Sequence, residues 1–160
     1  MLNPVSEVYM EENSLMGYED KEAFSHKGLL DLKQVKAHAK QLIEDYKVKV
    51  GSPRQKIREL SGGNAQKLIA AREITLGTPF LIACEPTRGI DIGAMDFIHD
   101  RLVEKRNQGD GILLVSSELS EIMTLSDRIY VIYEGRINGE FVRGDIDEKS
   151  LGLLMVGGHV

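Results

Sequence analysis

The stretch LSGGNAQK, residues 60–67, places a serine and two glycines where a helix is predicted to begin. Ser61 is a favourable N-cap, and Gly62 and Gly63 let backbone N–H groups approach a ligand without interference from a Cβ atom. Because the first-turn N–H groups carry the positive end of the helix dipole, this start favours an anion such as a phosphate. The helix is predicted to run over residues 64–76, before a glycine and a proline that stop it. The same residues also suit a plain helix cap or a flexible turn.

An apolar run followed by an acidic turn comes next, in the stretch FLIACEPTRGID at residues 80–91. Residues 80–84 are predicted to form a buried strand, which Pro86 ends. Glu85 therefore stands at the carboxyl end of the strand, where open α/β sheets present catalytic groups.

Together, the two stretches resemble the signature motif and the Walker B strand of ABC-type ATPases. The NAQK continuation and the PTRG turn are most similar to the second ATPase half of bacterial importers for simple sugars or nucleosides, in which both ATPase halves lie in one polypeptide. The resemblance covers nearly the whole chain. It implies a partial P-loop NTPase fold of the α/β class, with a mainly parallel sheet and a helical subdomain.

The phosphate-cradling pattern G-x-x-x-x-G-K-[ST] is missing from the sequence, in which no glycine is followed by lysine. The Walker A strand and loop, and the glutamine loop of the family, are therefore expected upstream of residue 1. We expect the chain to be the C-terminal part of an ATPase half, with residues 1–76 as a helical subdomain that ends in the signature helix. Residues 77–160 are expected to form the α/β core, with the Walker B strand, the switch region and a C-terminal hairpin and helix.

Periodicity and capping residues predict the remaining elements. A short helix over residues 4–13 and a loop over residues 14–30 precede a helix at 32–46 that Asp31 caps. The other predicted elements are helices at 92–108, 119–125 and 147–156, and strands at 112–116, 128–133 and 136–142, the last two forming a hairpin.

Composition excludes several classes of protein. The 160 residues, 42% of them hydrophobic, are enough for one core with a helical appendage. A net charge of −5 argues against a nucleic-acid or anionic-membrane surface, since both need clustered basic residues. Cys84 is the only cysteine, which excludes an internal disulfide and fits a reducing cytoplasm. The apolar runs are too short to cross a bilayer, and the four histidines lack ligand spacing.

In ABC ATPases, the signature of one half closes over ATP held by the P-loop of the other half. The resemblance assigns this role in trans to Leu60, Ser61, Gly62, Gly63, Asn64 and Gln66. Asn64 stands where many members of the family carry glutamine. Asp91 matches the D-loop, which communicates between halves, and it equally suits an N-cap for the helix that follows it.

The resemblance also indicates that the chain's own catalytic site is degenerate. Glu85 aligns with the catalytic base, although it also suits a turn cap or a partner for Arg88. Cys84 stands at the Walker B aspartate position, where a neutral thiol is a poor ligand for Mg²⁺, so no metal ligand is expected; alternatively it is a small buried apolar residue. Ser117 occupies the switch position, where the general family pattern has a histidine, and serine cannot carry a charge near neutral pH.

The leading hypothesis is therefore a part of the ATP-binding subunit of an ABC importer for simple sugars or nucleosides, which supplies the signature in trans. It implies ATP and Mg²⁺ in the full assembly but no tight binding by the chain alone. The implied partners are the first ATPase half of the same polypeptide, transmembrane permease subunits and, indirectly, a solute-binding protein, with no nucleic acid. The expected location is cytoplasmic, peripheral on the inner face of the cell membrane.

Two rival hypotheses remain open. The first is a non-catalytic interaction or regulatory module that docks on a membrane permease. The second is a soluble ABC-type ATPase of DNA repair or translation, which the lack of coiled-coil heptads and of a basic face disfavours.

Overall fold

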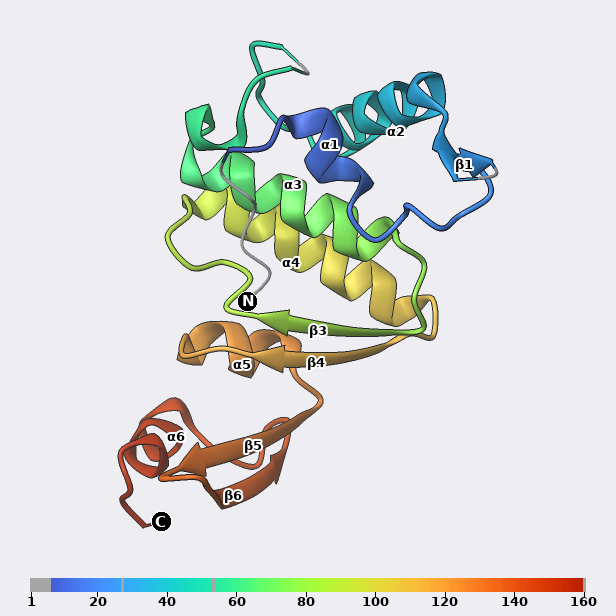
Figure 1. Cartoon of the computed structure of the whole chain (residues 1–160). Coiled ribbons are helices and arrows are strands. Elements are labelled where there is room, and N and C mark those ends of the chain that lie inside the picture. Colours follow the sequence, from blue (N-terminus) through green and yellow to red (C-terminus); the bar gives the residue numbers. More distant parts are fainter. Residues whose placement is uncertain (1–6, 27, 53, 160) are drawn as a thin grey trace. The chain divides into compact units, whose positions relative to one another are not determined.

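The computed structural model describes residues 7–26, 28–52 and 54–159 (Figure 1). Internal contacts divide the chain into two units. The first unit runs to Leu81 and also includes Pro86–Ile112, and the second contains Ile82–Glu85 and the chain from Leu113 onward. The predicted domain boundary between residues 76 and 77 falls inside the first unit and stays a prediction.

The first unit is mainly helical. Its elements are α1 (Met10–Leu15), the two-residue strands β1 (Ser25–His26) and β2 (Leu29–Leu30), α2 (Leu32–Asp45), the 3₁₀ helix η1 (Ile57–Glu59), α3 (Gly62–Thr75) and α4 (Ile92–Asn107). The predicted N-caps of the long helices are confirmed, because the side chains of Asp31, Ser61 and Asp91 each accept a hydrogen bond from a first-turn N–H group.

The N-terminal part of the chain differs from the prediction. A helix over residues 4–13 was expected, whereas α1 covers Met10–Leu15; residues 4–6 lie outside the described residues. Tyr9 forms an antiparallel bridge with Lys56, and the N–H of Met10 donates to the carbonyl of Gln55 at 3.0 Å. This pairing holds Tyr9 extended, so the helix cannot begin earlier. The predicted loop at 14–30 contains the end of α1 and the short β1–β2 hairpin.

α3 is held in place by the core of the first unit. Leu68 packs in a buried cluster with Met10, Ala39 and Ile57, and Ala71 packs in a second cluster with residues of α2 and the loop after it. Burying side chains of the size of Leu68 stabilises a fold by roughly 1.5–3 kcal/mol each. The body of α3 is therefore fixed, while its first residues, Ser61 and Gly62, stay exposed.

A buried arginine that the sequence did not single out ties α3 to α1. The Arg72 side chain is 3% exposed and forms an ion pair with Glu73 at 2.7 Å. Its Nη1 also donates to Oδ1 of Asn13 at 3.0 Å, and the hydroxyl of Tyr18 donates to its backbone carbonyl. The network links residues more than fifty positions apart, so no local pattern could reveal it.

Because of His38, we expect the stability of the first unit to depend on pH. Its ring packs against the rings of Tyr18 and Phe24, with centroids 4.5 and 5.0 Å away. Burial lowers the pKa of His38 below its ordinary value of 6.5, and the nearby Lys21 lowers it further. The unfolded chain therefore binds this proton more tightly, so the free energy of unfolding should be fully retained above pH 6.5 and should fall as the pH drops through the folded-state pKa.

Urea unfolding at about pH 7.5 and about pH 5.5 measures this dependence. A His38→Gln variant should lose less stability over this interval than the unsubstituted chain, whereas His26→Gln, at an exposed histidine, should behave like the unsubstituted chain. An equal pH dependence in the His38 and His26 variants would contradict the prediction.

The strands β3 (Phe80–Cys84) and β4 (Gly111–Val115) are hydrogen-bonded neighbours. The N–H of Gly111 donates to Pro79 at 2.9 Å, and the N–H of Glu85 donates to Val115 at 2.7 Å. One bond joins the two strand starts and the other joins the two strand ends, so the strands run parallel. α4 is the crossover connection that a parallel pair requires (Figure 1).

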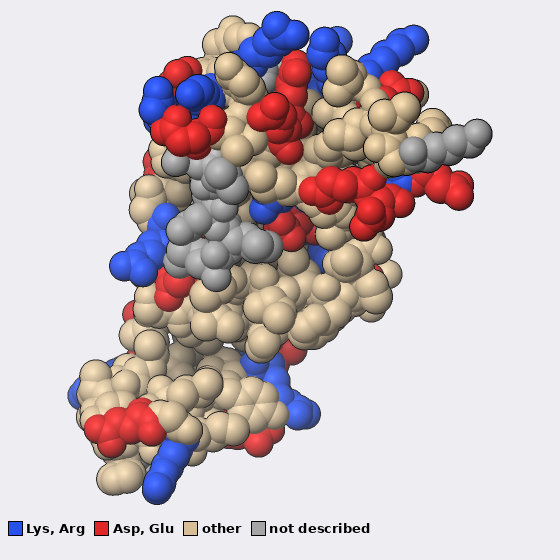
Figure 2. Space-filling model, viewed as in Figure 1, with Lys and Arg blue, Asp and Glu red and all other residues tan. Residues whose placement is uncertain are grey.

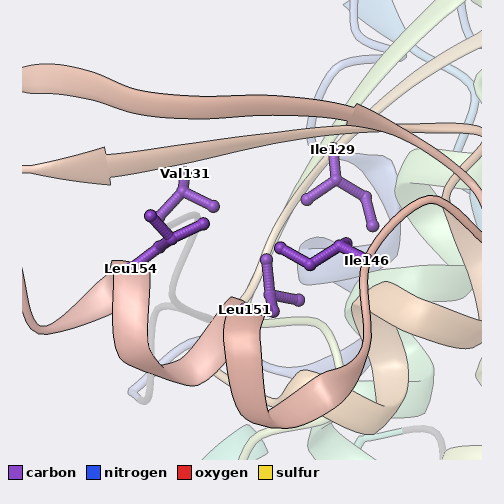
Figure 3. Packing of buried hydrophobic residues seen from close by; sticks show 5 residues of the cluster. All are labelled: Ile129, Val131, Ile146, Leu151 and Leu154. Atoms are coloured by element: carbon purple, nitrogen blue, oxygen red, sulfur yellow. The ribbon is translucent and has the colours of Figure 1, made fainter. Parts of the chain in front are cut away.

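The second unit also contains α5 (Leu119–Leu125), β5 (Arg128–Tyr133), β6 (Arg136–Val142) and α6 (Glu148–Met155). β5 and β6 form the predicted antiparallel hairpin, whose turn has Glu134 and Gly135 at φ 44° and 75°. α6 covers one face of the hairpin. Figure 3 shows the resulting cluster of Ile129, Val131, Ile146, Leu151 and Leu154.

The sheet is smaller than expected. A mainly parallel sheet with an antiparallel edge was predicted, whereas the described residues form three separate two-stranded sheets, of which β3–β4 is the parallel one. β5 pairs with β6 because a two-residue turn makes this contact local, and no other described strand pairs with β5. The α/β class itself is confirmed.

Acidic and basic side chains are interspersed on the face shown in Figure 2. The first unit has exposed ion pairs, such as Glu7 with Arg58 at 2.8 Å and Lys40 with Glu44 at 3.7 Å. Among the described helices, none combines the length and the apolar character that crossing a membrane would require.

Candidate functional site

The N-terminus of α3 carries the residues of the predicted signature. Leu60 closes the preceding η1 turn through its N–H, which donates to Ile57 at 3.0 Å. Ser61 has an extended backbone, with φ −64° and ψ 154°, and its side chain caps the helix. The first N–H groups of a helix have no partner within the helix, and here they belong to a glycine-rich, solvent-exposed start. The geometry therefore presents backbone donors and a positive dipole end to an anion.

Asn64 donates two hydrogen bonds to the hydroxyl oxygen of Ser61. Its Nδ2 donates to Ser61 Oγ at 2.9 Å, and its backbone N–H donates to the same oxygen at 3.4 Å. Since these two bonds use the acceptor capacity of the hydroxyl oxygen, the hydroxyl hydrogen is left to serve as a donor. The side chain of Asn64 is itself held by the N–H of Lys49, which donates to its Oδ1 at 2.7 Å.

Gly63 allows the start of α3 to lie against the loop that begins α4, whereas Gly62 has room for a Cβ atom. A Cβ atom on Gly63 would come within 3.3 Å of Asp91 Oδ2, and one on Gly62 would lie 3.5 Å from the carbonyl of Gly89. Asp91 caps α4 by accepting from the N–H of Ala94 at 3.0 Å. The predicted N-cap role of Asp91 is thus confirmed, and its D-loop role stays a prediction.

Gln66 joins the signature helix to the turn after β3. Its Nε2 donates to the carbonyl of Pro86 at 2.7 Å, and both residues lie in the first unit. The predicted contact of Gln66 with a nucleotide stays a prediction, but one N–H of its side-chain amide is already used to hold the PTRG turn at Pro86. This contact and the one between Asn64 and Lys49 were not predicted, because they join positions 20 and 15 residues apart.

The second unit brings Glu85 and Ser117 together. Glu85 Oε1 accepts from the N–H of Ser117 at 3.0 Å, and its Oε2 accepts from the Ser117 hydroxyl at 3.2 Å. Within the described residues, the Glu85 carboxylate is hydrogen-bonded to Ser117. The alternative prediction, in which Glu85 pairs with Arg88, is therefore wrong. The two predicted catalytic positions are in direct contact.

The thiol of Cys84 does not suit Mg²⁺. Cys84 is a half-buried free thiol, a donor that Mg²⁺ does not favour. Within the described residues, no cluster of three or more His, Cys, Asp or Glu side chains has a geometry that could hold a metal ion. The predicted roles of Glu85 and Ser117 in catalysis stay predictions.

The chain is similar in sequence to the ATP-binding proteins of several importers. No protein-family model matches it. The nucleoside import ATP-binding protein NupA of Lactococcus lactis is 40% identical over 156 residues, which cover 98% of this chain and 31% of the relative. The guanosine import ATP-binding protein NupO of Bacillus subtilis is 45% identical over 91% of this chain and 29% of the relative. The ribose import ATP-binding protein RbsA of Bacillus subtilis is 43% identical over 86% of this chain and 28% of the relative.

Solved structures with the same fold are ABC cassettes. The dimeric post-hydrolysis structure of the ATP-binding cassette MJ0796, bound to ADP and Pi, matches with a TM-score of 0.73 over 90% of this chain and 60% of that chain, at 19% identity. An ATP-binding subunit of an ABC transporter matches with a TM-score of 0.69 over 99% of this chain and 62% of that chain, at 22% identity.

The sequence matches span nearly the whole chain, but less than a third of the length of the curated relatives. The structural matches show the same α/β arrangement over most of the chain. Over the length described here, the chain therefore belongs to the family of ABC import ATP-binding proteins.

Proposed function

We propose that the chain forms part of a nucleotide-binding half of an ABC importer for simple sugars or nucleosides. In this proposal, the N-terminus of α3 completes, in trans, an ATP site whose P-loop lies on the partner half. The observation that carries the proposal is the exposed, glycine-rich start of α3, whose Ser61 hydroxyl is held as a donor by Asn64. Its setting in a chain 40% identical to a nucleoside import ATP-binding protein supports this reading.

The chemistry follows from the donors at this start. Bound ATP would supply the phosphoanhydride bond whose hydrolysis is coupled to transport. The N–H groups of the first helical turn and the Ser61 hydroxyl would bind the terminal phosphates and stabilise their charge as it shifts toward the transition state. The absence of side chains at Gly62 and Gly63 would let the phosphates approach the backbone.

We propose in addition that the site at this chain's own strand ends is degenerate. The thiol of Cys84 is a poor substitute for an Mg²⁺-associated carboxylate, and the hydroxyl of Ser117 cannot carry a charge near neutral pH. Any Mg²⁺ in the assembly would therefore be held by groups of the partner half and by the nucleotide.

The names of the import ATP-binding relatives, of which the chain spans 28–31% of the length, support the partners that we propose. They are a first ATPase half in the same polypeptide, transmembrane permease subunits and, indirectly, a solute-binding protein. In this arrangement the chain would be cytoplasmic and peripheral on the inner face of the cell membrane. The chain alone would not bind ATP tightly, because the P-loop belongs to the other half.

Affinity labelling tests the proposal. Cys84 is the only cysteine in these 160 residues. In an assembly whose other cysteines have been replaced, Cys84→Ser combined with Gly62→Cys gives a single thiol at the start of α3. In the importer assembly, an ATP analogue with a thiol-reactive group on its γ-phosphate should label this cysteine, and excess ATP should suppress the labelling. The same chain without the P-loop-bearing half should stay unlabelled.

A matched control places the single cysteine elsewhere. Gln108 is exposed and follows the end of α4, so a Gln108→Cys variant in the same background should not be labelled. Labelling of both variants alike, or labelling of Gly62→Cys without the partner half, would contradict the proposed site in trans.

A further inference from the structure

Three cations surround the ring of Phe97, in the second turn of α4. The Nζ of Lys67 lies 5.2 Å from the ring centroid, and the Nζ of Lys47 lies 5.9 Å from it. The Cζ of Arg101 lies 5.0 Å from the same centroid. All three distances fall within the range of about 6 Å over which a cation is attracted to an aromatic face. We call Lys47, Lys67, Phe97 and Arg101 the cationic cluster; all four residues belong to the first unit.

Three elements hold the cationic cluster together. Lys47 directly follows the end of α2, Lys67 lies on α3, and Phe97 and Arg101 lie one turn apart on α4. α3 and α4 pack side by side (Figure 1). The buried ring of Tyr46, at the end of α2, meets the ring of Phe97 at a centroid distance of 5.8 Å and an interplanar angle of 73°. The cations therefore converge because packed helices hold them there, and not because they are neighbours in the sequence.

The cationic cluster has an excess of positive charge. Glu104 pairs with Arg101 at 2.8 Å, and over the described residues it is the only carboxylate at ion-pair distance from any of the three cations. Two of the three positive charges therefore have no anionic partner there. The Nε of Arg101 is also buried without a hydrogen-bond partner among the described residues. Because like charges held close together repel each other, a bound anion would be favoured at this place.

The side chains of the cationic cluster suit a particular kind of anion. Solvent reaches them, since Lys47 is exposed and Lys67, Phe97 and Arg101 are half-buried. A guanidinium presents a rigid fork of N–H donors that matches an oxyanion, and a lysine adds a point charge. A phosphate monoester carries about −1.5 to −2 charges at pH 7, which matches the two positive charges that lack a partner.

We propose that the cationic cluster is a second anion site of the chain, and that it binds a phosphate group with about two negative charges, as the free ion or as a phosphate monoester. Lys67 lies about 7.5 Å along the helix axis beyond Gly62, so this site is separate from the start of α3. At the start of α3 the donors are backbone N–H groups, whereas here side chains supply full charges. The inference goes beyond the proposed function and does not depend on it.

NMR titration of the whole chain with orthophosphate tests the site. At constant ionic strength, the side-chain signals of Lys47, Lys67 and Arg101 should shift and should saturate. AMP, a phosphate monoester, should shift the same signals, and the probe that binds more tightly identifies the source of the phosphate group. Signals that saturate with neither probe would overturn the proposal.

Reversing one charge of the cationic cluster should remove the site. In Lys67→Glu the new carboxylate takes the place of the anion, so the dissociation constant for orthophosphate should rise at least about tenfold. Lys36→Glu is the matched control. It makes the same change in net charge at an exposed position near the start of α2, and it should change the dissociation constant by less than about threefold.

Equal weakening in Lys67→Glu and Lys36→Glu would show only a general effect of net charge and would overturn the proposal. Should Lys67→Glu not fold, Lys67→Gln removes the same positive charge. It should still weaken the binding of orthophosphate more than Lys36→Gln does.

Gly62→Asp tells the two anion sites apart. It adds a negative charge at the start of α3 and should leave orthophosphate binding at the cationic cluster within about threefold of its original strength. Loss of the shifts of Lys67 and Arg101 in this variant would mean that the phosphate binds at the start of α3, and would overturn the proposal without contradicting the site in trans. Conversely, a Gly62→Cys variant that stays unlabelled would contradict the proposed function and leave the cationic cluster unaffected.

Discussion

Replacing Gly62 with aspartate is expected to lower ATP turnover of the importer assembly by about 100-fold or more, the range seen when a preorganised anion site loses a donor. The new carboxylate would stand at the first position of α3, where the proposed triphosphate binds, and would repel it. The fold should tolerate the change. A Cβ on Gly62 makes only an ordinary 3.5 Å contact with the carbonyl of Gly89, and a negative charge suits a helix N-terminus.

Two further variants serve as comparisons. One separates the effect of the added charge from that of the added side-chain volume, and the other tests the proposed degenerate site. Gly62→Asn adds nearly the same volume without the charge, and it should lose distinctly less turnover than Gly62→Asp. Cys84→Asp restores a carboxylate at the proposed degenerate site and should raise turnover little, since Ser117 remains. Turnover should be measured as phosphate release by the reconstituted transporter. Normal turnover in Gly62→Asp, or a large gain in Cys84→Asp, would contradict the proposed asymmetry.

Removing the Arg72 side chain is expected to cause the largest loss of stability. In Arg72→Ala, the carboxylate of Glu73, 24% exposed, loses its partner, and Oδ1 of Asn13 loses a donor in a buried setting. Breaking a fully buried ion pair by removing one partner costs about 3–5 kcal/mol. Because the carboxylate left behind on Glu73 is partly exposed, the free energy of unfolding should fall by an amount near the lower end of this range, about 3 kcal/mol. Urea unfolding followed by circular dichroism measures the loss.

The chain offers a matched control for this substitution. Arg58 also pairs with a glutamate, Glu7, at 2.8 Å, but both side chains are more than half exposed. Exposed pairs contribute about 0–1 kcal/mol, so Arg58→Ala should change the free energy of unfolding by less than 1 kcal/mol. Equal losses in the two variants would show that burial of Arg72 does not govern its contribution.

Most elements of the fold could be predicted because their signals are local. Asp31, Ser61 and Asp91 cap helices through N–H groups two or three residues away, and the turn at Glu134–Gly135 joins adjacent strands. The start of α1 could not be predicted in this way. It depends on pairing of Tyr9 and Met10 with Lys56 and Gln55, which only the folded chain brings near.

The candidate site was predicted to a similar degree. The motifs located the start of α3 and the end of β3, and the resemblance assigned roles to their residues, which stay predictions. The partners of those side chains were missed: Lys49 for Asn64 and Pro86 for Gln66. A pattern of residue types identifies which groups can donate or accept, but it does not say which distant group will be within 3 Å.

The sequence by itself determined where the long helices α2, α3 and α4 are capped, which run forms β3 and that the chain resembles ABC ATPases, because each of these depends on residues that are neighbours along the chain. The prediction that β3 is buried was wrong for one of its faces, since Leu81 and Ala83 are buried but Phe80 and Ile82 are exposed.

Only the tertiary structure decided that Ser117 forms a hydrogen bond with Glu85, 32 residues away, and that Arg72 forms one with Asn13, 59 residues away. Such contacts form only after the apolar clusters have fixed the elements in space, since the cost of bringing distant residues together must first be offset by burial.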